Sequence, residues 1–378
     1  MRLSVEGPSL RRRIAKFAAM VQGILLLLHG FVYLTLVTLW GAPVGARLTI
    51  FRIVFAMLAI SFVPATLLAH RYFNGPVRFV YRLANIWLGT FNFLVMAACA
   101  SWVAYGVVRL AGLPVSGRAI AELCFGLAIG ASLYGVLNAA DIRVRRVRVK
   151  LPGLPESWRG RVAALVTDTH LGHIKGYRFL MRLVGMLRQL KADVVFISGD
   201  LFDGTKVDAR RLVSPWKQLR PKFGSYFVTG NHEEFSDPRK YLEAIEGSGV
   251  RVLRSEKVNL DGLQVVGMQY HDTTDAQHFE KVLKGTNVDP ERASVLLTHV
   301  PHGLPIAEKQ GISLQLSGHT HGGQMFPFTW LTSRIFGPYT YGLKKFGELL
   351  VYTSSGVGTW GPPMRVCTQP EIVLICFE

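Results

Sequence analysis

Four long apolar runs occupy the first 140 residues and alternate with short loops rich in arginine. Residues 17–40 form 24 consecutive positions without a formal charge. That length exceeds the apolar core of a signal peptide and matches the roughly 20 residues that cross a bilayer. We therefore predict a basic N-terminal tail over residues 1–16 and a transmembrane region over residues 17–140. Its four helices are expected at residues 17–40, 48–69, 83–108 and 119–140.

Two charged residues lie near the ends of predicted spans, Arg52 in the second and Glu122 in the fourth. Long charged side chains at such positions can reach the headgroup region. Charges within a membrane region can also face a polar cavity or one another. The sequence leaves both interpretations open.

After Asp141, where we place the domain boundary, short apolar runs end in polar clusters. Residues 142–150 nearly alternate apolar and basic positions, which predicts a strand with one face on a core and one face in solvent or near anionic headgroups. The remaining pattern predicts an α/β domain over residues 141–378, long enough for a full core. Buried strands are expected at 162–166, 194–197, 226–228, 295–297 and 314–316, and helices at 177–191, 207–220 and 238–247.

The basic residues of this chain are in excess mainly in the half that contains the predicted spans, which changes how a strongly basic composition is interpreted. The chain has 43 Lys and Arg against 25 Asp and Glu, but residues 1–150 hold 17 against 3 and residues 151–378 hold 26 against 22. The basic excess accompanies the spans, so a nucleic-acid partner is not expected. Outside the spans, 13 basic residues lie on the side of both termini and 3 on the other. We therefore expect a multi-pass protein of the cell (inner) membrane with a cytoplasmic C-terminal domain.

Two further features test the expected compartment. The triplet of residues 11–13 is all arginine and precedes an apolar run, as in a twin-arginine export signal, but three more spans argue against a cleaved signal. The four cysteines have no CxxC spacing, so neither a disulfide framework nor a thiolate zinc site is expected.

Carboxylates, an amide and imidazoles follow the predicted strands, and nine of the 11 histidines lie in the second half. The carboxyl ends of strands are where open α/β sheets place their sites. Mixed oxygen and nitrogen donors suit a pair of borderline divalent metals such as Mn, Fe or Zn better than an all-oxygen Ca or Mg cage. In chain order these residues are Asp168, His170, Asp200, Asp203, Asn231, His232, Glu233, His299, His319 and His321.

The order D-x-H, G-D-x-x-D, G-N-H-E, H and G-H-T-H over these positions resembles the calcineurin-like metallophosphoesterase superfamily. The similarity runs from about residue 145 to the end. Gly322 to Gln324, and the segment from Pro363 to Arg365, resemble its membrane-associated bacterial branch and transmembrane proteins with a metallophosphoesterase domain. The resemblance implies a four-layer α/β/β/α sandwich with metals at the sheet edge, here preceded by the four-helix transmembrane region.

The resemblance also implies two divalent metal ions, for which we favour manganese, with Fe, Zn or Mg as alternatives. One ion would be held by Asp168, His170 and His321, the other by Asn231, His299 and His319, and Asp200 would bridge them.

Two further residues receive catalytic roles from the resemblance. His232, beside a ligand, would stabilise or protonate the leaving oxygen without binding metal. Asp203 would orient that imidazole as a carboxylate–imidazole pair, although a helix N-cap is an alternative for it. Glu233 is expected to cap the following segment rather than to bind metal.

The implied reaction is hydrolysis of a phosphoester by metal-activated water, and the substrate stays open. A phosphodiester or pyrophosphate is expected, and a lipid-linked one would explain the membrane anchor. Residues 324–347 hold seven aromatic side chains, which either pack on the sandwich or form a loop that meets the interface and admits a lipid headgroup. The alternative function is a non-catalytic membrane sensor or scaffold. The expected partners are the bilayer and this substrate.

Overall fold

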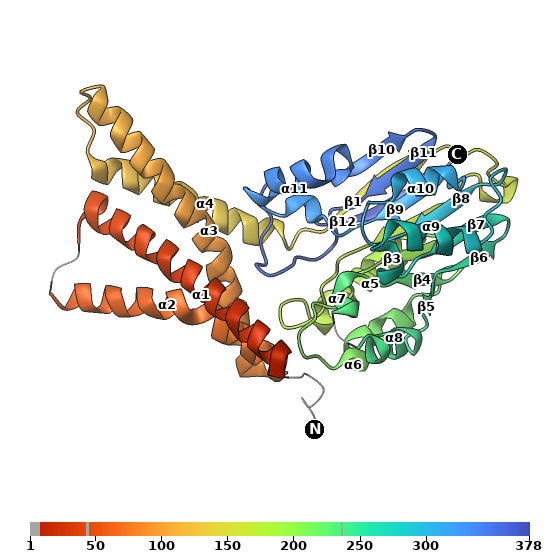
Figure 1. The fold of residues 1–378 in the computed structure, drawn as a ribbon, viewed down its shortest axis with the longest axis horizontal. Coiled ribbons are helices and arrows are strands. Elements are labelled where there is room, and N and C mark those ends of the chain that lie inside the picture. Colours follow the sequence, from red (N-terminus) through yellow and green to blue (C-terminus); the bar gives the residue numbers. More distant parts are fainter. Residues whose placement is uncertain (1–7, 43–44, 236) are drawn as a thin grey trace. The chain divides into compact units, whose positions relative to one another are not determined.

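The computed structural model describes residues 8–42, 45–235 and 237–378 (Figure 1). The chain divides into two compact units, Met1–Val136 and Leu137–Glu378. Residues 1–7 of the predicted basic tail, with Arg2, lie outside the described residues, and residues 8–16 belong to the first helix.

Four long helices form the first unit and confirm the four predicted spans. Each is long and apolar enough to cross a membrane, and each exposes apolar side chains such as Leu27 and Val103. Asn74 caps the third helix by accepting a hydrogen bond from the main-chain N–H of Val77 at 3.0 Å. The helices are α1 (Pro8–Thr35, continued by a π-helical segment at Leu36–Gly41), α2 (Ala46–Arg71), α3 (Gly75–Leu110) and α4 (Gly117–Asn138).

The two charged residues near the span ends contact polar side chains within this unit. Arg52 donates to the Tyr33 hydroxyl at 3.0 Å. Glu122 accepts from Arg118 at 2.8 Å and from the Trp40 indole at 3.2 Å. Both charges are thus paired with neighbours, as ionisable groups in membrane regions commonly are.

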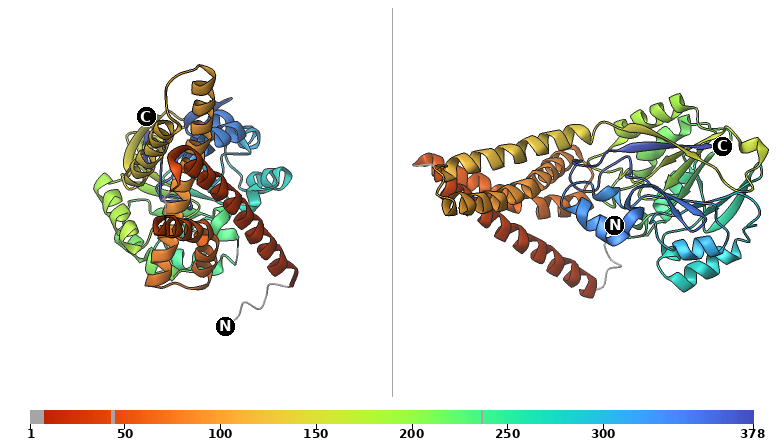
Figure 2. Two further views of the ribbon diagram at one scale, coloured as in Figure 1. Left: turned by 90° about the vertical axis from the view of Figure 1, so that its left-hand side faces the viewer. Right: turned by 90° about the horizontal axis from the view of Figure 1, so that it is seen from above.

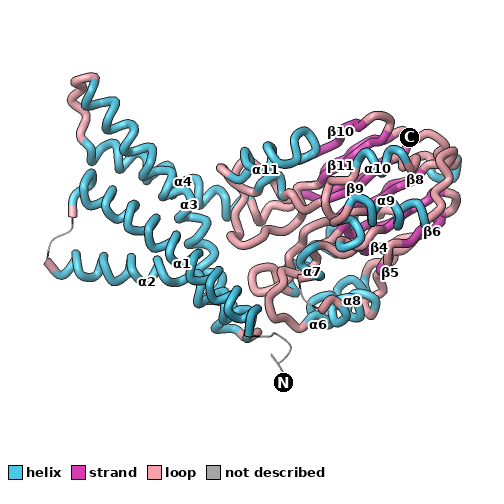
Figure 3. The backbone as a smooth tube through the Cα atoms, viewed as in Figure 1, coloured by secondary structure: helices cyan, strands magenta, loops and turns pink. Residues whose placement is uncertain are grey.

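Two six-stranded sheets form the second unit (Figures 2 and 3). The first sheet has the order β1 (Arg143–Val149), β12 (Glu371–Phe377), β2 (Val162–Val166), β3 (Val194–Ser198), β4 (Ser225–Val228), β5 (Arg251–Val252). The second has the order β10 (Gly342–Phe346), β11 (Leu349–Thr353), β9 (Leu314–Ser317), β8 (Ser294–Leu297), β7 (Leu263–Gly267), β6 (Glu256–Leu260). In the first sheet β12 and β2 are antiparallel and all other neighbours are parallel. In the second sheet the two edge strands, β10 and β6, are antiparallel to their neighbours and the four inner strands are parallel.

Three buried clusters arrange these sheets into the predicted four layers. Leu165 and Phe196 of the first sheet pack against Val295 and Leu316 of the second in one core between the sheets. The outer face of each sheet packs against its own helices in a further cluster. The helices on the first sheet are α5 (Tyr177–Leu190), α6 (Ala209–Val213) and α8 (Arg239–Glu246), and those on the second are α9 (Ala276–Gly285) and α10 (Leu304–Lys309). Two more helices, α7 (Asn231–Glu234) and α11 (Phe328–Phe336), belong to the loops beside the sheets.

The sequence located most of these elements closely. All five buried strands are confirmed to within a residue at each end, and α5 matches the predicted helix. In β1 the alternation is confirmed in part: Val147 and Val149 are buried and the arginines are exposed, but Val144 is exposed as well. The helix predicted at 207–220 is divided: α6 ends at Val213 and a 3-10 turn follows at Ser214–Gln218. Pro215 has no N–H to continue the α-helical ladder.

Candidate metal centre

Five loops bring the chemistry-bearing residues of both sheets to one edge. β2, β3 and β4 are parallel neighbours in the first sheet, as β8 and β9 are in the second, so their carboxyl ends lie at common edges. Ser198, at the end of β3, donates its hydroxyl to the carbonyl of Thr298 in the loop after β8 at 2.5 Å. The two sheets are therefore joined at the point where their loops meet.

The backbone is strained at several of these positions. Positive φ angles occur at Asp168 (52°), His170 (47°), Asp200 (49°), His319 (68°) and His321 (51°). Non-glycine residues adopt this left-handed region at a cost of about 1–2 kcal/mol each. Such strain gathers at sites whose side chains must point in one direction.

Glycines beside these residues allow the close approach. A Cβ at Gly230 would collide with Asp200, and one at Gly318 would collide with Asp168. A Cβ at Gly199 would collide with the imidazole of His299. The glycines of the G-D, G-N-H and G-H motifs therefore make room for the ligand-type side chains.

One group of such side chains consists of Asp168, His170 and His321, all buried. His321 Nε2 lies 3.5 Å, and His170 Nε2 3.9 Å, from Asp168 Oδ1. The two Nε2 atoms are only 3.0 Å apart. Two imidazole nitrogens repel one another at that distance unless a proton or a cation lies between them.

A second group contains Asp200, His299 and His319, with Asn231 beside them. The Nε2 atom of His299 is its centre, at 3.2 Å from Asp200 Oδ2, 3.1 Å from Asn231 Oδ1 and 3.2 Å from His319 Nδ1. Asp200 Oδ2 also lies 3.8 Å from His170 Nε2 of the first group. The Asp200 carboxylate therefore faces both groups.

His232 lies at the same edge but is held differently. Its Nε2 is 3.9 Å from Asp200 Oδ2, and it forms a third potential metal-binding group with His170 and Asp200. Its Nδ1 bonds to the main-chain carbonyl of Asp203 at 3.0 Å. The Asp203 carboxylate instead accepts hydrogen bonds from the N–H and hydroxyl of Thr205, at 2.9 and 2.5 Å. The predicted carboxylate–imidazole pair is thus replaced by a main-chain contact, because the side chain closes a local turn.

The electrostatics of the cluster favour a cation. Burial lowers the pKa values of His170 and His321 well below that of a free imidazole, and burial together with His299 lowers the pKa of His319 to about 4. Burial also lowers the pKa of His299, but the attraction of the Asp200 carboxylate outweighs burial and raises the pKa of His299 to about 10. Burial opposes ionisation of Asp200, yet His299 holds its pKa well below the usual range. Neutral imidazoles and an ionised carboxylate are the forms that bind metal.

The residues present therefore fit a pair of divalent ions. Each main group offers at least one carboxylate and two imidazoles whose ligand atoms lie within 4.8 Å of one another. His299 donates from Nδ1 to the Ser198 carbonyl at 3.0 Å, which directs Nε2 at Asp200. A metal bound there would replace the proton that the carboxylate otherwise holds on this ring. Mixed carboxylate and imidazole donors suit borderline metals.

Arg365 is a supporting residue whose role the motif analysis missed. It is fully buried and donates to the main-chain carbonyls of His321, Ser355 and Gly358 at 2.6 to 3.1 Å. Its Nη2 also lies 3.2 Å from His321 Nδ1. Burial lowers its pKa to about 10. Arg365 thus fixes the loop that carries a candidate ligand, and its position in a Pro-Met-Arg segment was the available signal.

Glu233 also supports the site rather than entering it. It is fully buried and accepts from the main-chain N–H groups of Asp200, Phe202 and Gly230 at 2.9 to 3.0 Å. Burial and the Asp200 carboxylate raise its pKa to about 8. The expectation that Glu233 caps the next segment is confirmed by its hydrogen bond from the N–H of Gly230, the residue before α7, and Glu233 additionally holds the loop of Asp200.

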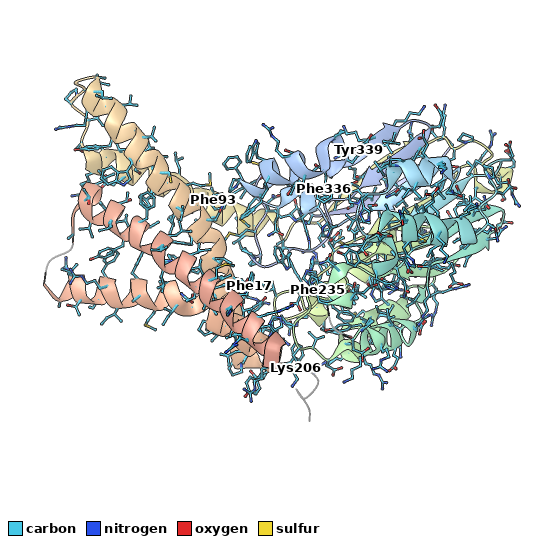
Figure 4. All side chains as sticks on the ribbon, in the orientation of Figure 1. Phe17, Phe93, Lys206, Phe235, Phe336 and Tyr339 are labelled. Carbon is cyan, nitrogen blue, oxygen red and sulfur yellow. The ribbon has the colours of Figure 1, made fainter. Side chains whose placement is uncertain are left out.

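Aromatic side chains line this edge. The ring centroids of Phe235 and Trp360 lie 5.0 and 6.2 Å from that of His232. Phe336 lies at the end of α11 (Figure 4), and its ring centroid is 6.1 Å from that of His319. Phe235 and Trp360 are 70% and 61% exposed. The metal cluster therefore has an apolar rim.

Comparisons with known proteins agree with this geometry. Residues 162–323 match the family model of the calcineurin-like phosphoesterases. Proteins named "Transmembrane protein with metallophosphoesterase domain" from Danio rerio and Bos taurus are 36% and 33% identical over 267 and 268 residues, which cover 65% of this chain and 60% of each relative. An "Uncharacterized metallophosphoesterase Cj0846" from Campylobacter jejuni is 31% identical over 251 residues, 65% of this chain and 66% of that protein.

The chain thus spans about 60% of the length of the two transmembrane relatives. The match contains every loop of the metal cluster from Asp168 to His321. With its two sheets, its buried His and Asp groups and these relatives, the second unit of this chain is a calcineurin-like metallophosphoesterase domain.

Proposed function

We propose that this protein is a membrane-anchored phosphohydrolase that cleaves phosphoester bonds with two divalent metal ions. The observation that carries the proposal is the convergence of two complete ligand groups on Asp200, with each group reaching that carboxylate from a different set of loops. An interaction scaffold has no need for strained, buried ligand positions of this kind.

In this proposal the two groups hold one ion each. Asp168, His170 and His321 hold the first, and Asn231, His299 and His319 hold the second, while Asp200 contributes to both. When bound, two such ions acidify a water molecule and neutralise charge that develops on the phosphoryl oxygens. Manganese is our first candidate, and Fe, Zn or Mg would suit parts of the same donor set.

His232 supplies the proton for the leaving oxygen. Its Nδ1 is fixed by the Asp203 carbonyl, so Nε2 points to the side of the ring that faces the cluster. A protonated imidazole there stabilises the negative charge of the leaving group and transfers its proton as the P–O bond breaks. Asp203 acts as a positioning residue through its main chain.

The substrate that we propose is a phosphodiester or pyrophosphate, and a lipid-linked one is favoured. Four spans tie the domain to a bilayer, and the exposed rings of Phe235 and Trp360 next to His232 offer an apolar contact beside the phosphoester. The excess of basic residues on the side of both termini places the domain in the cytoplasm in this proposal.

Metal analysis of the purified protein tests the proposal. The wild type should carry close to two equivalents of transition metal and hydrolyse an aryl phosphodiester. Asp200→Asn should lower the metal content and abolish hydrolysis, whereas Asp208→Asn, an exposed helix cap that asparagine serves equally well, should change neither. Unchanged metal content in Asp200→Asn contradicts the shared-ligand role. Full metal loading without hydrolysis of any phosphoester favours the scaffold instead.

The side of the membrane requires its own measurement. A C-terminal alkaline phosphatase fusion should be inactive and a matching fluorescent fusion bright, because the catalytic domain is proposed to be cytoplasmic. An active phosphatase fusion with a dark fluorescent fusion would contradict this and would make the arginines at residues 11–13 an export signal.

A further inference from the structure

Helix α11 exposes an apolar face that none of the described residues of the domain covers. The side chains of Phe328, Leu331 and Ile335 recur at helical spacing and are 49%, 48% and 66% exposed. Trp330 is 55% exposed beside them. None of the nine residues of this helix is buried, which is unusual for a helix with five large apolar side chains.

The opposite face of α11 is attached to the metal centre. Thr329 packs against Gly323, next to the loop of His321, where a Cβ would collide with the backbone of Thr329. Phe336 packs near His319, and the carbonyl of Thr332 accepts from the Thr340 hydroxyl at 3.3 Å. The helix is therefore a fixed part of the site whose outward face is free.

Hydrogen bonds connect the base of α11 to the junction with the last span. Asn138, the final residue of α4, donates to the carbonyls of Arg365 and Thr368 at 2.9 and 2.8 Å. The Thr368 hydroxyl and the N–H of Val366 both donate to the carbonyl of Gln324, at 2.9 and 3.0 Å. Gln324 lies four residues before α11, so the helix begins close to the point where the chain leaves the last span.

The link between span and domain is short. Only residues 139–142 separate α4 from β1, and four residues reach at most about 14 Å. Even this link is bound to the domain, because the carbonyls of Ala139 and Ala140 accept from Lys175 and Arg182 at 3.3 and 2.9 Å. The end of α4 and the start of α11 are therefore bound to the same part of the second unit.

The charge around α11 suits an anionic lipid surface. Residues 318–347 contain no Asp or Glu. Arg334 lies over the Trp330 ring at 5.4 Å, and Lys344 is exposed in β10, where the neighbouring Lys345 pairs with Glu348 at 3.1 Å. Arg145 of β1 adds a cation by donating to the Tyr341 hydroxyl at 2.8 Å. Apolar side chains flanked by tryptophan and basic residues are typical of helices that lie in a membrane interface.

We propose that α11 is an interfacial helix, which inserts Phe328, Leu331 and Ile335 into the leaflet on the catalytic side of the bilayer. Trp330 and Arg334 then lie among the headgroups. Since the inner face of the same helix contacts the loop of His319, the metal centre opens beside the lipid surface. This inference concerns binding alone and does not depend on the proposed hydrolysis.

Site-directed spin labelling of the full chain tests the proposal. The four cysteines are first replaced, and one new cysteine is introduced at Leu331, Ile335 or Ser333, which lies on another face of the same helix. Each protein is labelled with a nitroxide in liposomes of phosphatidylcholine with phosphatidylglycerol. Labels at 331 and 335 should collide with oxygen, relative to a water-soluble nickel complex, several-fold more often than the label at 333. Equal access of the nickel complex to all three positions would overturn the proposal.

A second variant keeps the test independent of any folding defect. Leu331→Asp should withdraw the label at 335 from the lipid, so that its preference for oxygen falls to that of position 333. Ser333→Asp adds the same charge to the same helix and should leave the label at 335 in the lipid. A label at 335 that is shielded from both reagents would show that protein, such as a second copy of this chain, covers the face, and would also overturn the proposal.

Discussion

Two buried histidines, one in each unit, have nearly the same local environment and different consequences. His29 in the helical unit and His232 at the metal centre each bond through Nδ1 to a main-chain carbonyl, Leu25 at 2.7 Å and Asp203 at 3.0 Å. Both lie against aromatic rings. The two histidines differ in the partner of Nε2. The Nε2 atom of His29 accepts a hydrogen bond from the Trp87 indole at 3.1 Å. The Nε2 atom of His232 lies 3.9 Å from Asp200 Oδ2, beyond hydrogen-bond distance.

This difference at Nε2 gives His29 a structural role and His232 a chemical one. With both nitrogens engaged, His29 joins α1 to α3 and holds a polar group satisfied among apolar helices. With one nitrogen fixed and the other directed at a carboxylate, His232 is oriented and still able to exchange a proton. Burial alone therefore does not distinguish the two roles, and the partner of the second nitrogen does.

Among variants that should keep both metal ions, the largest effect is expected from His232→Ala. The rate of hydrolysis should fall by about 10²–10⁴-fold, with both metal ions retained, because this side chain is proposed to serve the leaving group. The fall should be concentrated on alkyl esters, since an aryl oxide leaves without protonation. The measurement is kcat for an alkyl and an aryl phosphodiester together with metal content. Loss of a metal ion, or an equal fall for both esters, would make His232 a ligand or a general electrostatic group.

Arg365→Met should have the next largest effect, through the position of His321. Removing the guanidinium frees the loop carbonyls that it holds, and the loss of such supporting contacts costs about 10–100-fold in metal affinity. Titration of the metal-free protein with Mn²⁺ measures this. Arg254→Met, which removes an exposed ion pair with Glu246, is the matched control. Unaltered affinity in Arg365→Met would mean that the His321 loop is held by its strand alone.

Asp203→Asn should change kcat by less than about tenfold, below the range of a lost acid or base. Its main-chain carbonyl still accepts from His232, and asparagine can accept from Thr205 as the carboxylate does. The alkyl and aryl esters should be affected alike. A loss as large as that in His232→Ala, and confined to alkyl esters, would restore the carboxylate–imidazole pair.

His29→Phe should have the smallest effect and should leave hydrolysis unchanged. Phenylalanine keeps the stacking on Phe91 and leaves the Trp87 indole without its acceptor. Hydrogen bonds between membrane helices contribute about 0.6 kcal/mol on average, so the free energy of unfolding in detergent should fall by about that amount. A large loss of activity in this variant would show that the helical unit contributes to the chemistry, and the contrast with His232 would no longer hold.

The sequence predicted the ligand-type residues better than their supports. Asp168 and His321 belong to short motifs, each at the end of an apolar run, so local pattern was enough to find them. Arg365 and Glu233 act through hydrogen bonds to the backbone of loops that are distant in sequence, and the Pro-Met-Arg segment and the helix cap in which they occur do not indicate which loops those are. For the same reason the sequence assigned the Asp203 carboxylate to His232, although the turn at Thr205 engages it first.

Composition and periodicity by themselves determined the two-part organisation, the four spans, the strands of both sheets that carry the site, and the class of metal ligands. These depend on spacing of 3.6 or two residues and on the chemistry of single side chains, both of which are local. The resemblance implied that Asp200 bridges the two ligand groups, and the packing of the sheets brings its carboxylate to face both. Only the tertiary structure decided that the outer face of α11 is uncovered beside the metal centre. These features depend on which loops and faces meet after the two sheets pack, and packing joins residues a hundred or more positions apart.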